Sequence, residues 1–132
     1  MIGLDTNILV RYFIQDDPEQ TRLAVNLIDS LSTTESAWIG VAVFMELDWV
    51  LNNVLKVKKD RVVEIFNTLL VSQELVVENA DIVREALQLY RTRNTDFSDC
   101  LIASAAKQGG FFHFPESRWP RGLNCDRQKG GE

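Results

Sequence analysis

Four acidic residues have the type and position to bind a metal ion: Asp5, Glu46, Asp96 and Asp99. Each is expected at the end of a strand or on the face of a helix, where it can be held toward one spot. Carboxylates are rarely directed into apolar surroundings unless something compensates their charge. A divalent cation such as Mg²⁺ is the simplest compensation, because it prefers oxygen ligands. The acids therefore indicate a metal-dependent hydrolase that acts on a phosphodiester.

Asp5 has two interpretations that the sequence leaves open. It follows a short apolar run and precedes an expected helix, at the strand end where parallel sheets bind ligands. It can be a metal ligand there, with Thr6 or Asn7 orienting its carboxylate or contacting a phosphate. It can also be a helix N-cap, a common role for Asp, Thr and Asn. Both roles are compatible if Asp5 is the ligand and Thr6 is the cap.

The other three acids lie in expected helices. Glu46 is placed between Val43 and Val50 so that it borders the buried stripe of its helix, although it can also lean out to water or pair with an Arg. Asp96 and Asp99 share one face of a helix's first turn, where capping and the helix dipole also explain acids. Because Asp99 flanks the buried side of that helix, a role beyond a surface cap is favoured more for Asp99 than for Asp96.

Short strands and helices must alternate along the chain to position these acids. Strands are expected at 1–4, 37–41 and 75–77, the first of them buried and central. Asp17, Pro18 and Gln20 give the strongest helix start, as N-cap, first helical residue and partner in a capping box. The other helices are expected to start at Asp5 or Thr6, within the stripe 43–54, at Asp60, at Asn79 or Asp81, and at Thr95. This order predicts an α/β domain with a parallel sheet.

The composition limits the possible functions. The chain has 132 residues, of which 45% are hydrophobic and 25% charged, as expected for one globular domain over residues 1–132. Its net charge of −5 argues against sequence-indifferent coating of nucleic acid, but allows an enzyme that grips a few phosphates. The sequence shows no run of membrane-spanning length and no signal-peptide pattern, so we expect a cytoplasmic protein.

Residues that support other chemistry are few. His113 is the one histidine, expected to pack among Phe residues, and Cys100 and Cys125 are expected to be reduced thiols. Metal chemistry must therefore use oxygen ligands, and no Ser-His or Cys-His arrangement offers a nucleophile instead. A phosphotransfer domain that accepts phosphate on an Asp is a weaker alternative, because it leaves Glu46 without a role.

Basic residues near the acids can contact a substrate. Arg11 follows the first acid closely, and Arg91 and Arg93 precede Asp96, so these guanidinium groups can hold phosphates of RNA. They can equally be solvated charges or ion-pair partners of the acids. The run formed by Lys56, Lys58, Lys59 and Arg61 is expected to be a solvated turn.

Taken together, these segments resemble the PIN-domain nucleases, specifically the toxin half of VapBC-type toxin–antitoxin modules. The resemblance is carried by residues 2–12 (IGLDTNILVRY), 16–20 (DDPEQ), 43–51 (VFMELDWVL) and 96–103 (DFSDCLIA), and it covers about residues 1–108. It implies a three-layer α/β/α PIN-like domain with a central, mainly parallel sheet. It also implies a Mg²⁺- or Mn²⁺-dependent endoribonuclease.

The resemblance assigns roles to several residues. Asp5, Glu46 and Asp99 match the metal-holding acids, Asp96 an auxiliary acid, and Thr6 and Asn7 the residues that support the first Asp. It implies an RNA substrate, a homodimer and a cognate antitoxin that covers the site. Most aromatic residues are expected in the core, while some can form a dimer face or an antitoxin groove. These residues are Tyr12, Phe13, Trp38, Phe44, Trp49 and Phe66.

The C-terminal segment departs from the family. A further acid usually follows the last strand in a Thr-Phe-Asp-Arg-like stretch, but here the candidate strand 111–114 leads into 115–120 (PESRWP). Glu116 can stand in for that acid, whereas Asp126 lies too far along. Our hypothesis is that residues 111–132 are divergent or frame-shifted. An impaired PIN-like module that binds an antitoxin without turnover is therefore the alternative function.

Overall fold

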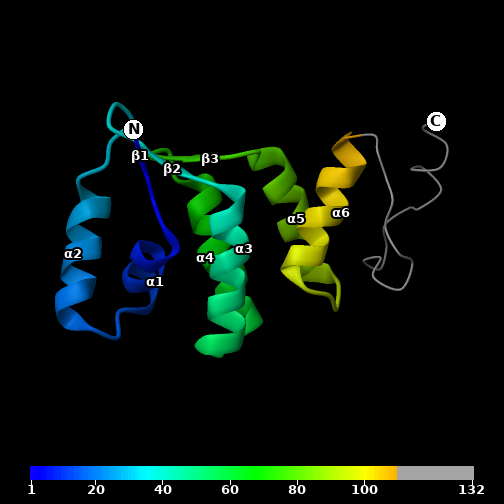
Figure 1. The fold of residues 1–132 in the computed structure, drawn as a ribbon, viewed down its shortest axis with the longest axis horizontal. Coiled ribbons are helices and arrows are strands. Elements are labelled where there is room, and N and C mark those ends of the chain that lie inside the picture. The colour runs from blue at the N-terminus through cyan, green and yellow to red at the C-terminus, as the bar shows by residue number, and fades with distance from the viewer. Residues whose placement is uncertain (110–132) are drawn as a thin grey trace. The chain divides into compact units, whose positions relative to one another are not determined.

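The computed structural model describes residues 1–109, and the chain divides into two compact units, Met1–Glu78 and Asn79–Glu132 (Figure 1). The first unit contains, in order, β1 (Ile2–Gly3), α1 (Thr6–Ile14), α2 (Pro18–Asp29), β2 (Ala37–Ile39), α3 (Val41–Trp49), the π-helical turn η1 (Val50–Val54), α4 (Lys59–Val71) and β3 (Leu75–Val77). Within the described residues, the second unit contains α5 (Ala80–Thr92) and α6 (Phe97–Gly109). The expected single domain over 1–132 stays a prediction.

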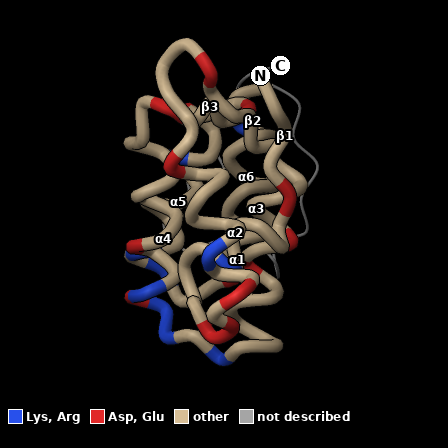
Figure 2. Tube along the Cα trace, turned by 90° about the vertical axis from the view of Figure 1, so that its left-hand side faces the viewer, with Lys and Arg blue, Asp and Glu red and all other residues tan. Residues whose placement is uncertain are grey.

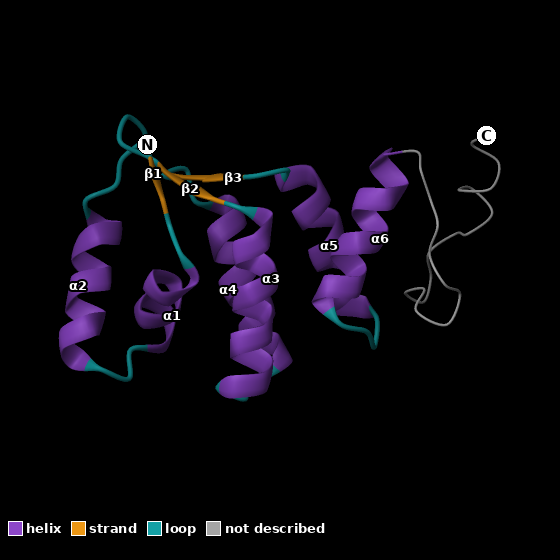
Figure 3. Cartoon of the chain, viewed as in Figure 1, coloured by secondary structure: helices purple, strands orange, loops and turns teal. Residues whose placement is uncertain are grey.

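The three strands form a parallel sheet in the order β1-β2-β3 (Figure 3). Ile2 pairs with Ala37, and Ala37 pairs with Leu75. Within residues 1–109, β2 is therefore the central strand and β1 pairs on one side, where Ile2 is 45% exposed. The expectation of a buried, central first strand is wrong for this sheet. The parallel pairing and the strand at 75–77 are confirmed.

Side-chain capping explains where the first two helices begin. Asp5 accepts a hydrogen bond from the backbone N–H of Ile8 at 3.0 Å, so Asp5 is the N-cap of α1. Asp17 accepts from the N–H groups of Glu19 and Gln20 at 3.1 and 3.2 Å, as expected for the start of α2. The sequence Asp17-Pro18 therefore predicted the start of α2 correctly.

The start of α4 differs from the prediction. The N-cap is Lys58 and makes no side-chain capping bond, whereas Asp60 lies inside the first turn. An acid in the first turn is still favourable, because it faces the positive end of the helix dipole. Figure 2 shows the basic positions grouped in the segment that leads into α4. The expected Asp60 cap is therefore wrong, because the helix begins two residues earlier.

The helix α3 continues into η1, and its buried face is shifted around the helix from the expected one. The buried residues are Phe44, Leu47, Asp48 and Leu51, which follow helical spacing, while Val54 is 55% exposed. Of the expected stripe, Leu47 and Leu51 are buried as predicted, whereas Val43 and Val50 are half-buried and Val54 is exposed. This segment is apolar almost all round, so its periodicity gives no clear phase.

The core of the first unit is formed mainly by its helices and β2. Its buried apolar residues include Leu9, Ala24, Ala37, Ile39, Phe44, Leu47, Leu51, Val62, Ile65, Phe66 and Leu69. Phe44 of α3 and Phe66 of α4 meet edge to face, with ring centroids 5.4 Å apart. Both are core residues as expected, whereas Trp38 and Trp49 are 40% and 58% exposed.

The described part of the second unit is a pair of packed helices. Tyr90 of α5 meets Phe97 of α6 edge to face at 5.8 Å, and both are buried. Lys107 Nζ lies 2.9 Å from Glu85 Oε1 across the pair. The helix α6 starts at Phe97, two residues after the expected start.

Within residues 1–109, none of the helices combines the length and apolar character that a membrane crossing requires. The expectations for the strand 111–114 and for Glu116, Asp126, His113 and Cys125 fall outside the described residues.

Candidate active site

Asp5 lies where β1 gives way to α1, at the strand end that the sequence predicted. Its side chain is exposed, and its Oδ1 atom is fixed by the bond from Ile8 N–H. Among the described residues its Oδ2 atom takes part in no hydrogen bond, so this oxygen can serve a ligand while Oδ1 caps the helix. The N-cap interpretation of Asp5 is confirmed, and the alternative in which Thr6 is the cap is wrong. Thr6 is buried, with 4% of its surface exposed.

Asn7 and Arg11 follow on α1 at a spacing of one helical turn. Asn7 is exposed, and the Arg11 guanidinium lies 3.7 Å from Asp16. The ion-pair alternative for Arg11 is therefore seen, but with Asp16 rather than with one of the four candidate acids. Because this pair is well exposed to solvent, it holds the guanidinium only weakly. Its role in RNA binding stays a prediction.

Glu46 is an exposed residue of α3. It lies off the buried face defined by Phe44, Leu47 and Leu51, so its side chain is not among apolar core residues as expected. The helix α3 follows β2 as α1 follows β1, and the two helices pack against each other. Since β1 and β2 are parallel neighbours, the starts of α1 and α3 lie at the same edge of the sheet.

Asp96 and Asp99 belong to the second unit. The carbonyl oxygen of Asp96 accepts a hydrogen bond from Cys100 N–H at 3.1 Å, which places Asp96 at the entry to α6. Asp96 is exposed and Asp99, in the first turn, is half-buried. Arg91 is exposed near the end of α5, and Arg93 is half-buried just after it. The predicted first-turn position is thus confirmed for Asp99, whereas Asp96 lies one residue before the helix, and the roles of both stay predictions.

The predicted metal site joins Asp5 and Glu46 of the first unit to Asp96 and Asp99 of the second. Taken separately over residues 1–109, neither unit gathers three His, Cys, Asp or Glu side chains close enough to hold a metal ion. The donor types still fit a hard cation, because all four candidates are carboxylates and at least Asp5 and Glu46 are open to solvent. The metal site itself stays a prediction.

Asp48 is a buried acid that the sequence reasoning missed. It is 8% exposed, and Asn52 Nδ2 donates to its Oδ1 at 2.7 Å and to its carbonyl oxygen at 2.8 Å. The signal was present, since Asp48 lies one turn after Phe44 and one turn before Leu51. A buried carboxylate held this way supports the helix at its junction with η1.

A cavity of about 330 Å³ lies between α1 and α2 and was also not predicted. Asn7, Ile8 and Arg11 line it from α1, and Gln20, Leu23 and Ala24 line it from α2. Two of these residues, Asn7 and Arg11, are candidate site residues, and Asn7 follows Asp5 by two positions. The cavity therefore adjoins the candidate active site within the first unit.

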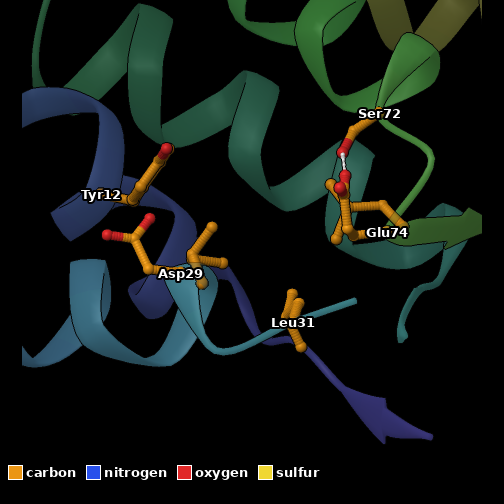
Figure 4. A pocket seen from close by; sticks show the side chains of 7 residues that line it. Tyr12, Asp29, Leu31, Ser72 and Glu74 are labelled. Carbon is orange, nitrogen blue, oxygen red and sulfur yellow. Dashed lines mark hydrogen bonds between the residues drawn. The ribbon is translucent and has the colours of Figure 1, made fainter. Parts of the chain in front are cut away.

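A second cavity of about 280 Å³ lies at the opposite end of the sheet (Figure 4). Its lining includes Tyr12, Asp29 and Leu31, together with Ser72 and Glu74, whose side chains are joined by a 2.9 Å hydrogen bond. Ser72 and Glu74 precede β3, whereas Asp5 follows β1, and the two strands run in the same direction. This cavity is thus separate from the candidate active site.

Comparison with known proteins identifies the family. A PIN domain family model matches residues 2–113. The chain belongs to the PIN domain family, which confirms the α/β fold class and the predicted resemblance.

One curated protein and one solved structure are similar to this chain. The VapC ribonuclease of Aquifex aeolicus is 30% identical over 108 residues, which is 81% of this chain and 79% of that protein. Among solved structures, the Mycobacterium tuberculosis toxin VapC20, described as cleaving the sarcin-ricin loop, is 17% identical with a TM-score of 0.47. That match covers 94% of this chain and 97% of the other.

Proposed function

We propose that this protein is a metal-dependent endoribonuclease, the toxin component of a toxin–antitoxin system. The observation that carries the proposal is its 30% identity, over 81% of its length, to a VapC ribonuclease. Supporting it, the first candidate acid lies at the end of a strand in a parallel sheet, where α/β proteins bind their ligands. RNA is the proposed substrate, and hydrolysis of its phosphodiester bonds is the proposed reaction.

Asp5, Glu46 and Asp99 are proposed to hold Mg²⁺ or Mn²⁺, with Asp96 as an auxiliary acid. When bound, the ion supplies activation of the attacking water and neutralises charge on the phosphate oxygens. Asp5 is suited to this role because the hydrogen bond from Ile8 fixes its carboxylate before any ligand arrives. Because the Asp5 carboxylate is already oriented, less free energy is lost in orienting it when the metal ion binds. Thr6 and Asn7 follow Asp5 in the same helical turn.

Substrate binding is assigned to the arginines. Arg11 lies one helical turn beyond Asn7, and its partner Asp16 holds it through an exposed pair that a phosphate can replace. Arg91 and Arg93 are proposed to contact the RNA backbone from the second unit. A cognate antitoxin, a homodimer and a cytoplasmic location complete the proposal, and exposed Trp49 is a candidate for either protein interface.

The test is RNA cleavage by the full-length chain with Mg²⁺, compared with the same reaction in excess chelator and with an Asp5→Asn variant. Asn caps helices as well as Asp, so this change removes the charge while keeping the fold. Asp29→Asn is the matched control, because Asp29 is an exposed acid that lines the other cavity. Cleavage that survives chelation and Asp5→Asn equally would contradict the proposal. A folded chain without cleavage that still binds its antitoxin would support the impaired-module alternative.

A further inference from the structure

The cavity between α1 and α2 has a composition suited to one particular kind of ligand. Its residues follow helical spacing, 7, 8 and 11 on α1 and 20, 23 and 24 on α2, so each helix presents one face to it. Ala24 is buried, and its small side chain leaves the cavity open. Leu23 is 59% exposed. An exposed leucine beside an open cavity offers an apolar wall to a ligand.

Two amide side chains supply polar groups on the same cavity. Asn7 and Gln20 are exposed, and among residues 1–109 neither side chain makes a hydrogen bond. Each amide carries a carbonyl acceptor and an NH₂ donor, so both can pair with a planar ligand edge that offers the complementary groups. The edges of nucleobases are such ligands, and Asn and Gln pair with them through two hydrogen bonds.

The walls of the cavity are held in place before a ligand binds. The N–H of Gln20 donates to Asp17 Oδ1 at 3.2 Å in the capped first turn of α2. The hydroxyl of Thr21 in α2 lies 3.5 Å from the carbonyl oxygen of Arg11 in α1, which links the two helices. Holding the backbone of the two helices in this way reduces the part of the ordering cost of binding that comes from the backbone.

We propose that this cavity is the subsite for one unpaired nucleobase of the RNA substrate. Asn7 and Gln20 hydrogen-bond the edge of the base, Leu23 covers its face, and Arg11 binds the adjoining phosphate. Sequence-specific RNA recognition commonly uses such splayed single-stranded bases. The inference rests on the proposed ribonuclease function, since Asp5 precedes Asn7 by two residues and brings the cleavage site next to the cavity.

The first test measures binding without cleavage. The full-length Asp5→Asn chain is titrated with each of the four nucleoside monophosphates while the side-chain NH₂ signals of Asn7 and Gln20 are followed by NMR. At least one nucleotide is expected to shift both signals, and Gln20→Leu is expected to weaken its binding about tenfold. Asn26→Leu, an exposed amide elsewhere on α2, is the matched control and keeps the affinity. No shift with any nucleotide overturns the proposal, whether or not the chain cleaves RNA.

The second test uses cleavage of a randomised RNA pool by the full-length chain. Gln20→Leu and Leu23→Ala are expected to flatten the base preference next to the cleaved bond by about tenfold, compared with Asn26→Leu. Cleavage with an unchanged preference in all three variants overturns the subsite while leaving the ribonuclease function standing. If the Asn7 and Gln20 signals respond to a protein partner and to no nucleotide, the cavity belongs to a protein interface and the proposal fails.

Discussion

The side-chain amide of Asn52 donates a 2.7 Å hydrogen bond to the buried carboxylate of Asp48, one turn before it in the helix. The next residue, Asn53, donates to the carbonyl oxygen of Trp49 at 3.2 Å but is exposed. The two neighbouring amides therefore make similar local bonds in different surroundings. Of the two, only Asn52 donates to a charged group that is shielded from water.

Asn52→Ala is predicted to lower the free energy of unfolding by about 1–3 kcal/mol, because the Asp48 carboxylate loses a donor in a buried position. Asn53→Ala is predicted to change it by no more than about 0.5 kcal/mol. Urea denaturation followed by circular dichroism measures both values. Equal values for the two variants would show that the Asp48 pair does not stabilise the fold.

Asp5 is predicted to serve the fold and the reaction separately. Asp5→Asn keeps an N-cap acceptor for Ile8, whereas Asp5→Ala removes it and costs about 1 kcal/mol of stability. Both variants remove the charge and are predicted to reduce RNA cleavage by at least about a hundredfold. This is more than the loss expected for a residue that only hydrogen-bonds a metal ligand.

Thermal unfolding and initial cleavage rates, measured on the same preparations, separate these effects. Activity that falls in Asp5→Ala and survives in Asp5→Asn would assign Asp5 to capping alone.

The exposed Trp49 and the buried Phe44 lie in the same helix and are predicted to respond differently to truncation. Phe44→Ala removes a ring that contacts Phe66 and is predicted to cost about 3–5 kcal/mol. Trp49→Ala is predicted to leave the unfolding free energy within about 0.5 kcal/mol, because its ring is 58% exposed. Urea unfolding measures both, and a large loss for Trp49→Ala would mean that its ring packs in the folded protein.

The sequence predicted the start of helix α2 better than it predicted which face of helix α3 is buried. Asp17 and Pro18 set the start of α2 correctly, since an Asp cap before Pro has few other meanings. The buried face of α3 was misplaced, because Val41, Val43, Phe44, Met45 and Trp49 put apolar side chains almost all round the helix. The π-helical turn η1 then changes the phase again, since its hydrogen bonds span five residues instead of four.

In the candidate site too, features set by neighbouring residues were predicted better than features that depend on how the helices pack. Local pattern placed Asp5 after β1 and Asp99 in the first turn of the last helix, and both positions are confirmed. It placed Glu46 beside the core, whereas Glu46 is exposed, because the face of α3 was misjudged. Gln20 and Leu23 were missed as lining residues, since a cavity depends on how α1 and α2 pack and no local pattern reports this.

Glu46 provides the sharpest test of the metal site. As a ligand it contributes charge to the ion, so Glu46→Gln is predicted to raise the Mg²⁺ concentration for half-maximal cleavage by more than about tenfold. High Mg²⁺ or Mn²⁺ is predicted to restore part of the activity, because mass action offsets a weaker site. Glu35→Gln, a change at another exposed acid of the first unit, is the control and keeps the wild-type metal dependence. Isothermal titration of the metal into each protein gives the same comparison without turnover, and identical Mg²⁺ affinities for both variants would remove Glu46 from the ligand set.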